Sequence, residues 1–541
     1  MRKVLVACAG IAALAFSTGA SASDWTTTVP FTNQVASTPV AGGGYTSEGG
    51  APSPGGCGPT MLNSNRSESW IAVKPGTEDL VGTSKFFVDT WSTYYNFHLG
   101  SYTIPNGVVA SNNQVQGYEC TTVGTQDMPP SWTNNTDPNA DFDTQGRVYQ
   151  TTLPFNAYWT NLHPNAAVML SYSDDLGKTW VKGNGGRPLE QSPNASSVQF
   201  GHVEDKQWIA VDHFGVSKFK DRVYAMWAIF NGSAIKVAYA WSKDRGQTFS
   251  KVQTLSPPSE VGPAVTYVIP SVGADGTVYV AVTSFPPNGA ATHIYVTSSK
   301  DGGVTWAPFS DASGVVGIND VKLPNTRFRD GIVDSFAASP TYPGHLYVTW
   351  EEWDGAQFDV YFAHSENAGV SWSDRELVND NADRAASDQF QPQVAAGPGG
   401  AVAVAFYDRR QACPGDKSVA AADRGLANFC IDTTLQAYRD SGSGPVPVLG
   451  NARFSTFTWD PEQPLQTVDG LRQDACASHN VPCRTTFIGD YFGLAVSGSA
   501  IYGLFVSTHY ASKVKADGGG SVYYQQQVLA TAPRSGFGAG Y

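Results

Sequence analysis

The sequence predicts an all-β protein, a β-propeller of four-stranded blades in which seven blades are favoured over six. A turn motif of the form Ser-x-Asp-x-Gly-x-Thr-Trp recurs along the chain, and a second pattern, a turn followed by an alternating strand, recurs independently of it. The composition agrees, because 56 Gly, 33 Pro, 14 Trp and 24 Tyr supply many turns and large strand-forming aromatics. Sheets stacked around a channel also accommodate 541 residues, which exceed one ordinary core.

The turn motif first occurs at residues 173–180. There Asp175 offers a carboxylate to the turn amides, Gly177 takes a backbone region that other residues avoid, and Trp180 buries itself beside the turn. Three further copies follow: Ser242, Asp244, Gly246, Thr248 and Phe249; Ser299, Asp301, Gly303, Thr305 and Trp306; and a weaker one, Ser365, Asn367, Gly369, Ser371 and Trp372. Such a motif folds a hairpin, so we expect these positions to be structural.

This motif resembles the Asp-box, or bacterial neuraminidase repeat, of sialidases and other β-propellers. The resemblance extends over residues 60–530. It implies a propeller whose boxes lie on the face opposite the active site, and it implies a carbohydrate-active function of the sialidase type.

The second pattern predicts the inner hairpin of each blade. It occurs seven times, at residues 78–81, 146–149, 221–224, 276–279, 344–347, 400–403 and 499–502. Seven candidate blades follow from this count, whereas sialidases of the superfamily usually have six. The sixth blade carries only a decayed box, at residues 438–442.

The two ends of the chain differ in composition from the repeats. The predicted organisation is a signal peptide at residues 1–22, an N-terminal arm at 23–60, the propeller at 61–530 and a mobile tail at 531–541. The first segment combines Arg2 and Lys3 with an apolar run to Phe16 and a small-residue end at Ala22, which is typical of secretory signals. We therefore expect a secreted or periplasmic protein.

Six of the seven cysteines remain after removal of the signal, and an even number in a secreted chain favours disulfides. Proximity suggests Cys413 with Cys430 and Cys476 with Cys483, which leaves Cys57 with Cys120, although about 15 connectivities are open. No cysteine pair has zinc-site spacing, so no metal or cofactor is expected. Calcium at the alternating Asp137, Asn139, Asp141 and Asp143 is a minority alternative.

The net charge of −13 argues against nucleic acid or an anionic membrane as a partner. No later stretch has the roughly 18 apolar residues of a membrane span. A carbohydrate substrate or ligand is the expected partner, and nothing in the sequence indicates an oligomeric state.

The repeat register predicts where a ligand would bind. The end of the channel opposite the boxes receives the start of each first strand and the end of each second strand. The ionisable residues at the starts are Arg66, Asp205, Lys206, Arg327, Arg329, Asp330, Asp388, Arg484, Asp490 and Tyr491. Those at the ends are Lys85, Asp89, Glu351, Glu352, Asp354, Tyr407, Asp408, Arg409, Arg410, His509 and Tyr510.

The sialidase resemblance implies a role for some of these residues. A sialidase uses three arginines to bind the substrate carboxylate, a tyrosine nucleophile beside a glutamate base, and an aspartate acid. The matching arginines are Arg329, Arg409 and one of Arg66 or Arg484. Tyr491 is the expected nucleophile, Glu351 or Glu352 its base, and Asp205 the acid.

Other interpretations stay open, because the Arg-Ile-Pro opening of sialidases is absent and Arg66 follows Ser64-Asn65 instead. Asp490 and Tyr491 would then close the ring, and Arg409 and Arg410 would be surface features. A lyase on uronic-acid glycans would use His509 or Tyr510 as its base. A non-catalytic glycan- or protein-binding propeller is the third alternative.

Overall fold

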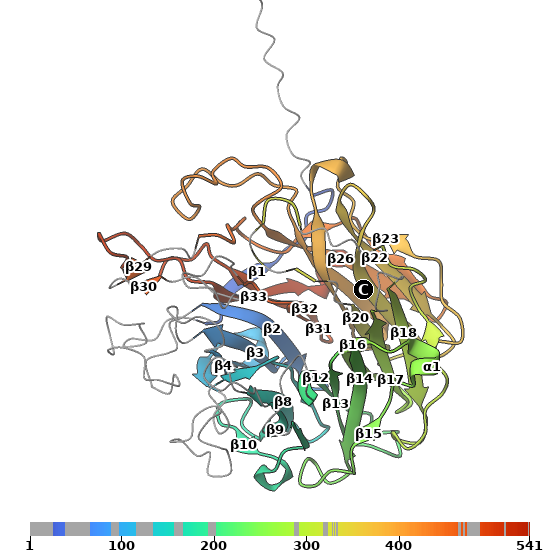
Figure 1. Ribbon diagram of the computed structural model, residues 1–541. Coiled ribbons are helices and arrows are strands. Elements are labelled where there is room, and N and C mark those ends of the chain that lie inside the picture. The colour runs from blue at the N-terminus through green and yellow to red at the C-terminus, as the bar shows by residue number, and fades with distance from the viewer. Residues whose placement is uncertain are drawn as a thin grey trace, which may run out of the picture.

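Seven antiparallel sheets form a closed ring around a central channel (Figure 1). The computed structural model describes residues 25–37, 65–87, 97–114, 134–155, 166–192, 202–285, 292–317, 323–326, 328, 330–331, 334–463, 467–468, 471–472, 487–512, 515–538 and 540–541. The predicted all-β propeller with seven four-stranded blades is confirmed.

The first four blades follow one another along the chain, and each has its first strand innermost. Blade 1 contains β2 (Arg66–Val73), β3 (Leu80–Phe87), β4 (Phe97–Ile104) and β5 (Ser111–Gln114). Blade 2 contains β6 (Asn134–Thr136), β7 (Asp141–Phe142), β8 (Val148–Phe155), β9 (Ala167–Ser173), β10 (Val181–Lys182) and β11 (Glu190–Gln191). Blade 3 contains β12 (His202–Val211), β13 (Val223–Asn231), β14 (Ala234–Ser242) and β15 (Gln253–Thr254). Blade 4 contains β16 (Val265–Val272), β17 (Val278–Ser284), β18 (His293–Ser299) and β19 (Ser310–Asp311).

The remaining three blades complete the ring. Blade 5 contains β20 (Ser335–Ala338), β21 (Leu346–Trp353), β22 (Phe358–Ser365) and β23 (Glu376–Leu377). Blade 6 contains β24 (Gln389–Ala396), β25 (Ala401–Asp408), β26 (Asp432–Asp440), β27 (Pro445–Pro447) and β28 (Ala452–Arg453). Blade 7 contains β31 (Gly493–Val496), β32 (Ala500–Ser507), β33 (Gln526–Pro533) and β1 (Thr32–Val35). A short hairpin, β29 (Thr467–Val468) and β30 (Leu471–Arg472), and one helical turn, α1 (Pro258–Val261), lie outside the blades.

The two ends of the chain close the ring together. Strand β1 pairs antiparallel with β33, from Thr32 opposite Thr531 to Val35 opposite Val528. Part of the segment predicted as an N-terminal arm is therefore the outermost strand of blade 7. Within the predicted tail, Phe537 and Tyr541 are buried in the hydrophobic core that blades 6 and 7 share.

The four turn motifs fold as their residues predict. In the third copy, Asp301 accepts hydrogen bonds from the Thr305 amide (2.9 Å) and from the Ser299 hydroxyl (2.8 Å). The aromatic residue is half-buried in every copy rather than fully buried, because it packs against the preceding blade with its other face in solvent. Trp180, for example, donates a hydrogen bond to Ser101 of blade 1 (3.0 Å). We call this end of the propeller, where Asp175, Asp244, Asp301 and Asn367 lie, the box end.

The predicted Cys413–Cys430 disulfide is present, with a Cα–Cα distance of 5.1 Å. Cys57, Cys120, Cys476 and Cys483 lie outside the described residues, as do the predicted signal peptide and its cleavage point. Among the helices that the structure describes, none is long and apolar enough to cross a membrane.

Candidate active site at the channel end opposite the boxes

The innermost strands share one irregularity at the end of the channel opposite the boxes. Strands β2, β12, β16 and β24 each shift register near their start, as at a β-bulge. At each shift one residue adopts a positive φ: Glu68 (45°), Lys206 (51°), Tyr267 (51°) and Gln391 (46°). Asp137, between β6 and β7, has a φ of 56°.

This conformation is strained for residues other than glycine, and such strain concentrates at functional sites. A bulge also re-aims the side chain that it carries. The positive φ recurs in five blades, four of them with a bulge, and in each blade a polar residue carries it near this end of the channel. We name this region the channel end.

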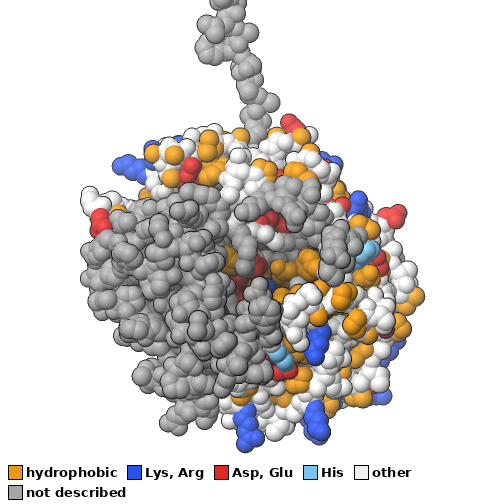
Figure 2. Space-filling view, in the orientation of Figure 1, with side chains coloured by type: hydrophobic (Ala, Val, Ile, Leu, Met, Phe, Trp, Pro, Cys, Tyr) orange, Lys and Arg blue, Asp and Glu red, His pale blue; other side chains and the backbone are white. Residues whose placement is uncertain are grey.

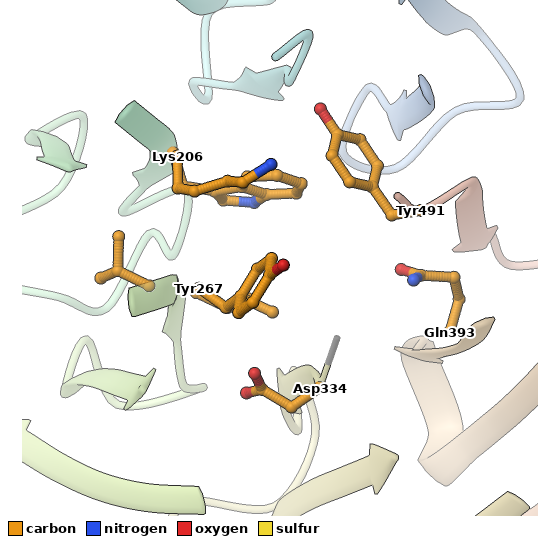
Figure 3. A pocket seen from close by; sticks show the side chains of 8 residues that line it. Lys206, Tyr267, Asp334, Gln393 and Tyr491 are labelled. Atoms are coloured by element: carbon orange, nitrogen blue, oxygen red, sulfur yellow. The ribbon is translucent and has the colours of Figure 1, made fainter. Parts of the chain in front are cut away.

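A pocket opens at the channel end, with about 340 Å³ of empty space including its solvent-filled mouth. Figure 3 shows Lys206, Tyr267, Asp334, Gln393 and Tyr491 arranged around it, from different blades. The remaining lining residues are Trp208, Val268 and Ile269. On the face shown in Figure 2 the surface is hollowed near its centre, where acidic and hydrophobic side chains are visible.

The aromatic wall of the pocket is built around Tyr491. Its ring packs edge-to-face against Trp208 (5.0 Å between centroids) and Trp70 (6.4 Å). Its hydroxyl donates a hydrogen bond to the Pro138 carbonyl oxygen (3.0 Å). Burial, with the negative charges of Glu68 and Asp137, raises the pKa of Tyr491 well above its usual value, so the phenol is neutral.

One side of the pocket holds four carboxyl groups and two lysines, which we call the Asp205 cluster: Glu68, Asp137, Asp205, Asp490, Lys85 and Lys206. Lys206 Nζ lies 2.7 Å from Asp490 Oδ2, and Lys85 Nζ lies 2.8 Å from Glu68 Oε2. The Lys206 amide donates to both Asp205 Oδ1 (2.8 Å) and Asp137 Oδ2 (3.1 Å). The backbone amide of Lys206, a residue with a positive φ, therefore bridges the carboxyl groups of Asp205 and Asp137.

Within the Asp205 cluster, Asp205 itself can keep a proton near neutral pH. Burial raises the pKa of Asp205 to about 7, against the opposing charge of Lys206 and with further support from Asp137. Burial also raises the pKa of Glu68, although Lys85 opposes this. Asp205 and Asp137 are close enough to share a proton, so Asp205 suits the role of an acid.

A second carboxyl pair lies elsewhere around the channel: Glu351 is on β21 of blade 5, and Asp330 precedes β20 of the same blade. Burial raises the pKa of Glu351 well above its usual value, and the negative charge of Asp330 raises it further. Burial also raises the pKa of Asp330 to about 7. Gln391 bridges this pair to blade 7, because its amide nitrogen Nε2 donates to Asp330 (3.1 Å) and to the Gly489 carbonyl oxygen (2.9 Å).

Arg409 is fully buried beside the second pair. Its Nη1 donates to the Pro324 carbonyl oxygen (2.6 Å), and Asp388 lies 3.9 Å away. Within the described part of the chain, Nε and Nη2 have no hydrogen-bond partner. Burial lowers the pKa of Arg409 to about 10, which leaves it charged at neutral pH. A buried guanidinium with unused donors is costly, and an anionic ligand or water would satisfy it.

The structure brings some predicted site residues together and separates others. Tyr491 and Asp205 both belong to the channel end, since Asp205 is among the charges that raise the pKa of Tyr491. Glu351 instead has Asp330 and the Gln391 amide (2.6 Å) as its partners. The carboxyl group of the Glu68 side chain is the one whose charge acts most strongly on Tyr491.

The predicted arginine clamp stays a prediction. Arg66 is fully buried at the start of β2, and its charge acts on Tyr102 of β4. No contact among the described residues joins it to Arg409. Arg329 and Arg484 lie outside the described residues.

The alternative candidates have other partners. Glu352 pairs with Arg375 (2.6 Å), and Arg410 pairs with Asp408 (2.7 Å). His509 stacks on Phe457 (3.7 Å between centroids) and hydrogen-bonds Ser418 (2.9 Å). Burial lowers the pKa of His509 and raises that of the adjacent Tyr510.

The four residues suggested for calcium have separate partners. Asn139 donates to three backbone carbonyl oxygens, one of them that of Thr151 (3.2 Å). Asp143 accepts from turn amides and pairs with Arg245 (2.7 Å), and Asp141 accepts from the Val211 amide (2.7 Å). Calcium binding here stays untested.

Sequence reasoning missed Glu68, Tyr267, Asp334 and Gln391, and it named Asp137 only as a candidate calcium ligand. Each lies within a few residues of a predicted strand start, so the register already indicated the region. The bulges could not be read from the pattern, and they decide which residue faces the channel.

Comparison with known proteins does not assign this chain to a family. No family model matches it, and no curated protein matches it. Among solved structures, it is similar to a protein of unknown function from Dyadobacter fermentans (11% identity, TM-score 0.39, 87% of this chain and 95% of that chain covered). It is also similar to a Hadza microbial sialidase (14%, 0.39, 82% and 75%) and to an α-L-arabinofuranosidase of Fusarium graminearum (12%, 0.38, 74% and 94%). These scores are low, so the function proposed next rests on the residues of this chain.

Proposed function

We propose that this chain is a carbohydrate-active propeller that hydrolyses glycosidic bonds at the channel end. The observation that carries this proposal is Asp205, whose pKa burial raises to about 7 and which lies with Asp137 beside the aromatic pocket. Glycosidases of most kinds need a carboxyl group that stays protonated until it donates to the leaving oxygen. Aromatic faces such as Trp208 and Tyr267 suit the apolar faces of sugar rings.

The expected mechanism uses Tyr491 as the nucleophile, as sialidases do. Its oxygen attacks the anomeric carbon while its proton passes to a nearby carboxylate, and Asp205 protonates the departing oxygen. Water then cleaves the covalent sugar–enzyme bond, with Asp205 acting as the base. Glu68 is better suited than Glu351 to accept the tyrosine proton, because its charge already acts on Tyr491.

The proposed substrate is an exo-linked sialic-acid-like or other carboxylated sugar. Arg409 supports this class, because its Nε and Nη2 groups have no partner among the described residues and would suit a carboxylate. A second candidate is a glycosidase for neutral sugars. The four carboxyl groups of the Asp205 cluster favour it, since they would repel a carboxylate placed beside Tyr491.

A panel of three substrates tests the proposal: a fluorogenic sialoside, a fluorogenic neutral arabinofuranoside and a uronic-acid polysaccharide. We expect turnover of the sialoside, and Asp205→Asn and Tyr491→Phe should each lower kcat about 100-fold or more. Because Asp205 must hold its proton, kcat/KM should fall as pH rises through about 7. In Asp205→Asn the remaining kcat/KM should not show this fall.

Glu366→Gln is the matched control, because Glu366 pairs with His364 at the box end and should leave kcat unchanged. Turnover of the arabinofuranoside alone, with the same dependence on Asp205, would show that the substrate is a neutral sugar. The role of Asp205 as the acid would then still stand. An unsaturated uronate product would indicate a lyase. Saturable glycan binding without turnover of any substrate would contradict the hydrolase proposal.

A further inference from the structure

Two strands from neighbouring blades bring three potential metal ligands together. Glu190 lies on β11 of blade 2, and His202 and Glu204 lie on β12 of blade 3. His202 and Glu204 are alternate residues of one strand, so their side chains leave it on the same side. One ligand atom from each of the three residues lies within 4.8 Å of the others.

The distances within this group approach those of a metal site. His202 Nε2 lies 3.5 Å from Glu190 Oε1 and 2.8 Å from Glu204 Oε1. Ligands at about 2.1 Å from a tetrahedral ion are roughly 3.4 Å apart. The first separation already fits, and the second would need to open by well under 1 Å, a rotation of one carboxylate.

The buried charge of Glu204 provides an independent indication of a ligand. Its side chain is fully buried, and its Oε2 atom has no hydrogen-bond partner among the residues that the structure describes. A buried carboxylate oxygen without a partner is costly unless a cation compensates it. No ion pair among the described residues joins Lys236 to either glutamate.

A further contact orients Glu190. Trp227, fully buried in β13, donates its Nε1 hydrogen to Glu190 Oε2 at 2.6 Å, which leaves Oε1 directed at His202. Metal-binding carboxylates are commonly held in this way by a neighbouring donor. The group therefore combines three ligands with a contact that orients Glu190, and one carboxylate oxygen of Glu204 has no partner among the described residues.

We propose that Glu190, His202 and Glu204 bind a divalent transition-metal ion of the zinc class and thereby join blade 2 to blade 3. The imidazole of His202 indicates which class of metal ion binds. Ca²⁺ and Mg²⁺ prefer all-oxygen ligands, whereas Zn²⁺ accepts nitrogen and carboxylate oxygen together. Binding would neutralise Glu204 and displace any proton from His202. This site is separate from the proposed hydrolase chemistry and does not depend on it.

Zinc titration of the untagged full-length protein against a chromophoric chelator tests the site. We expect one site per chain that is lost, or weakened at least about 10-fold, in His202→Ala and in Glu204→Gln. Glu190→Gln should also weaken zinc binding. Because Glu190 is partly exposed, we expect this substitution to leave the protein folded, so a loss of zinc binding in this variant would not reflect a loss of folding. His364→Ala is the matched control, because His364 pairs with Glu366 (2.7 Å) without a third ligand, and it should bind zinc as the wild type does.

Two further measurements separate metal binding from a purely structural role. Zinc should raise the Tm of the wild type, whereas Glu204→Gln should keep or raise the Tm measured in EDTA and abolish the zinc-dependent gain. X-ray absorption at the zinc edge should show mixed nitrogen and oxygen ligands with one imidazole. Trp227→Phe should weaken zinc binding roughly 10-fold.

The proposal would be overturned by equal zinc affinity in the wild type and in Glu204→Gln, or by sulfur or multi-imidazole coordination. Selective binding of Ca²⁺ over Zn²⁺ would overturn the assigned class of ion.

Discussion

The two ends of the propeller use aspartate in opposite ways. At the box end, burial tends to raise the pKa of Asp301, but hydrogen bonds from the Thr305 hydroxyl and amide hold it at about 2. At the channel end, burial raises the pKa of Asp205 and of Asp334 to about 7. The difference lies in burial and in the number of donors. A turn at the surface surrounds its carboxylate with amides and hydroxyls, whereas the channel end buries its carboxyl groups with fewer donors, and Asp137 adds a negative charge beside Asp205.

This contrast distinguishes aspartates that fold the chain from those that store protons. The first kind is stabilising and is predictable from a local motif. The second kind costs stability, and such groups accumulate where chemistry is done. Each of the following experiments tests one side of the contrast.

The largest expected effect is the pH dependence due to Asp334. Thr283 donates to one of its oxygens, and no described residue is a partner of the other, Oδ2. Because its folded pKa is raised from 3.8 to about 7, its contribution to stability is present below about pH 4 and is lost as pH rises to about 7. At most this amounts to roughly 4 kcal/mol.

Urea denaturation of the wild type and of Asp334→Asn at pH 4.5 and pH 8 measures this effect. We expect the variant to gain stability relative to the wild type at the higher pH. If the stability difference between the variant and the wild type is the same at both pH values, Asp334 does not have a raised pKa in the folded protein, and the prediction is wrong.

The second largest effect is expected at Gly489, where blade 7 meets the strained Glu68 of blade 1. Its φ is 115°, and a Cβ atom there would lie 2.6 Å from the Glu68 nitrogen. Gly489→Ala should therefore cost about 3 kcal/mol in the free energy of unfolding, measured by chemical denaturation.

Gly185→Ala provides the comparison near the box end. Gly185 also has a positive φ, of 61°, but its added Cβ would meet nothing within 4 Å. We expect a cost of about 1 kcal/mol there. Equal costs at the two glycines would mean that crowding at the channel end does not matter.

The smallest effect is expected for a single box. Asp301→Ala removes the acceptor for the Val304 and Thr305 amides, which should cost about 1 kcal/mol. Because the pKa of Asp301 is lowered, its contribution is present above about pH 4 and is lost as pH falls through about 2. Substrate turnover and zinc binding should remain at wild-type levels, and a change in either would show that the two ends are coupled.

The fold was predictable because its signals are local. The box of Ser299, Asp301 and Gly303 makes its own hydrogen bonds within one turn, and Cys413 and Cys430 are close in sequence as well as in space. Strand β1 was missed, because the sequence Thr-Asn-Gln-Val has little alternation and its partner is distant in the chain.

The site was predictable only in part, because it depends on contacts between blades. The register placed Asp205 and Tyr491 at the end of the channel where the pocket opens. It could not foresee that Glu68, with a positive φ, would lie close enough to act on Tyr491, or that Glu351 would pair with Asp330. Such pairings arise from the geometry of the ring rather than from local sequence.

The pairing of β1 with β33 has a consequence for how the chain reaches this structure. Ser37 and Gln526 hydrogen-bond across 489 residues, and this contact belongs to the seam that holds the ring shut. During vectorial synthesis or export, the first strand to emerge must wait, unpaired, until nearly all of the chain has followed. We therefore expect closure of the ring of blades to be the last step of folding. We also expect it to be the slowest step, because β1 and β33 are far apart in the chain.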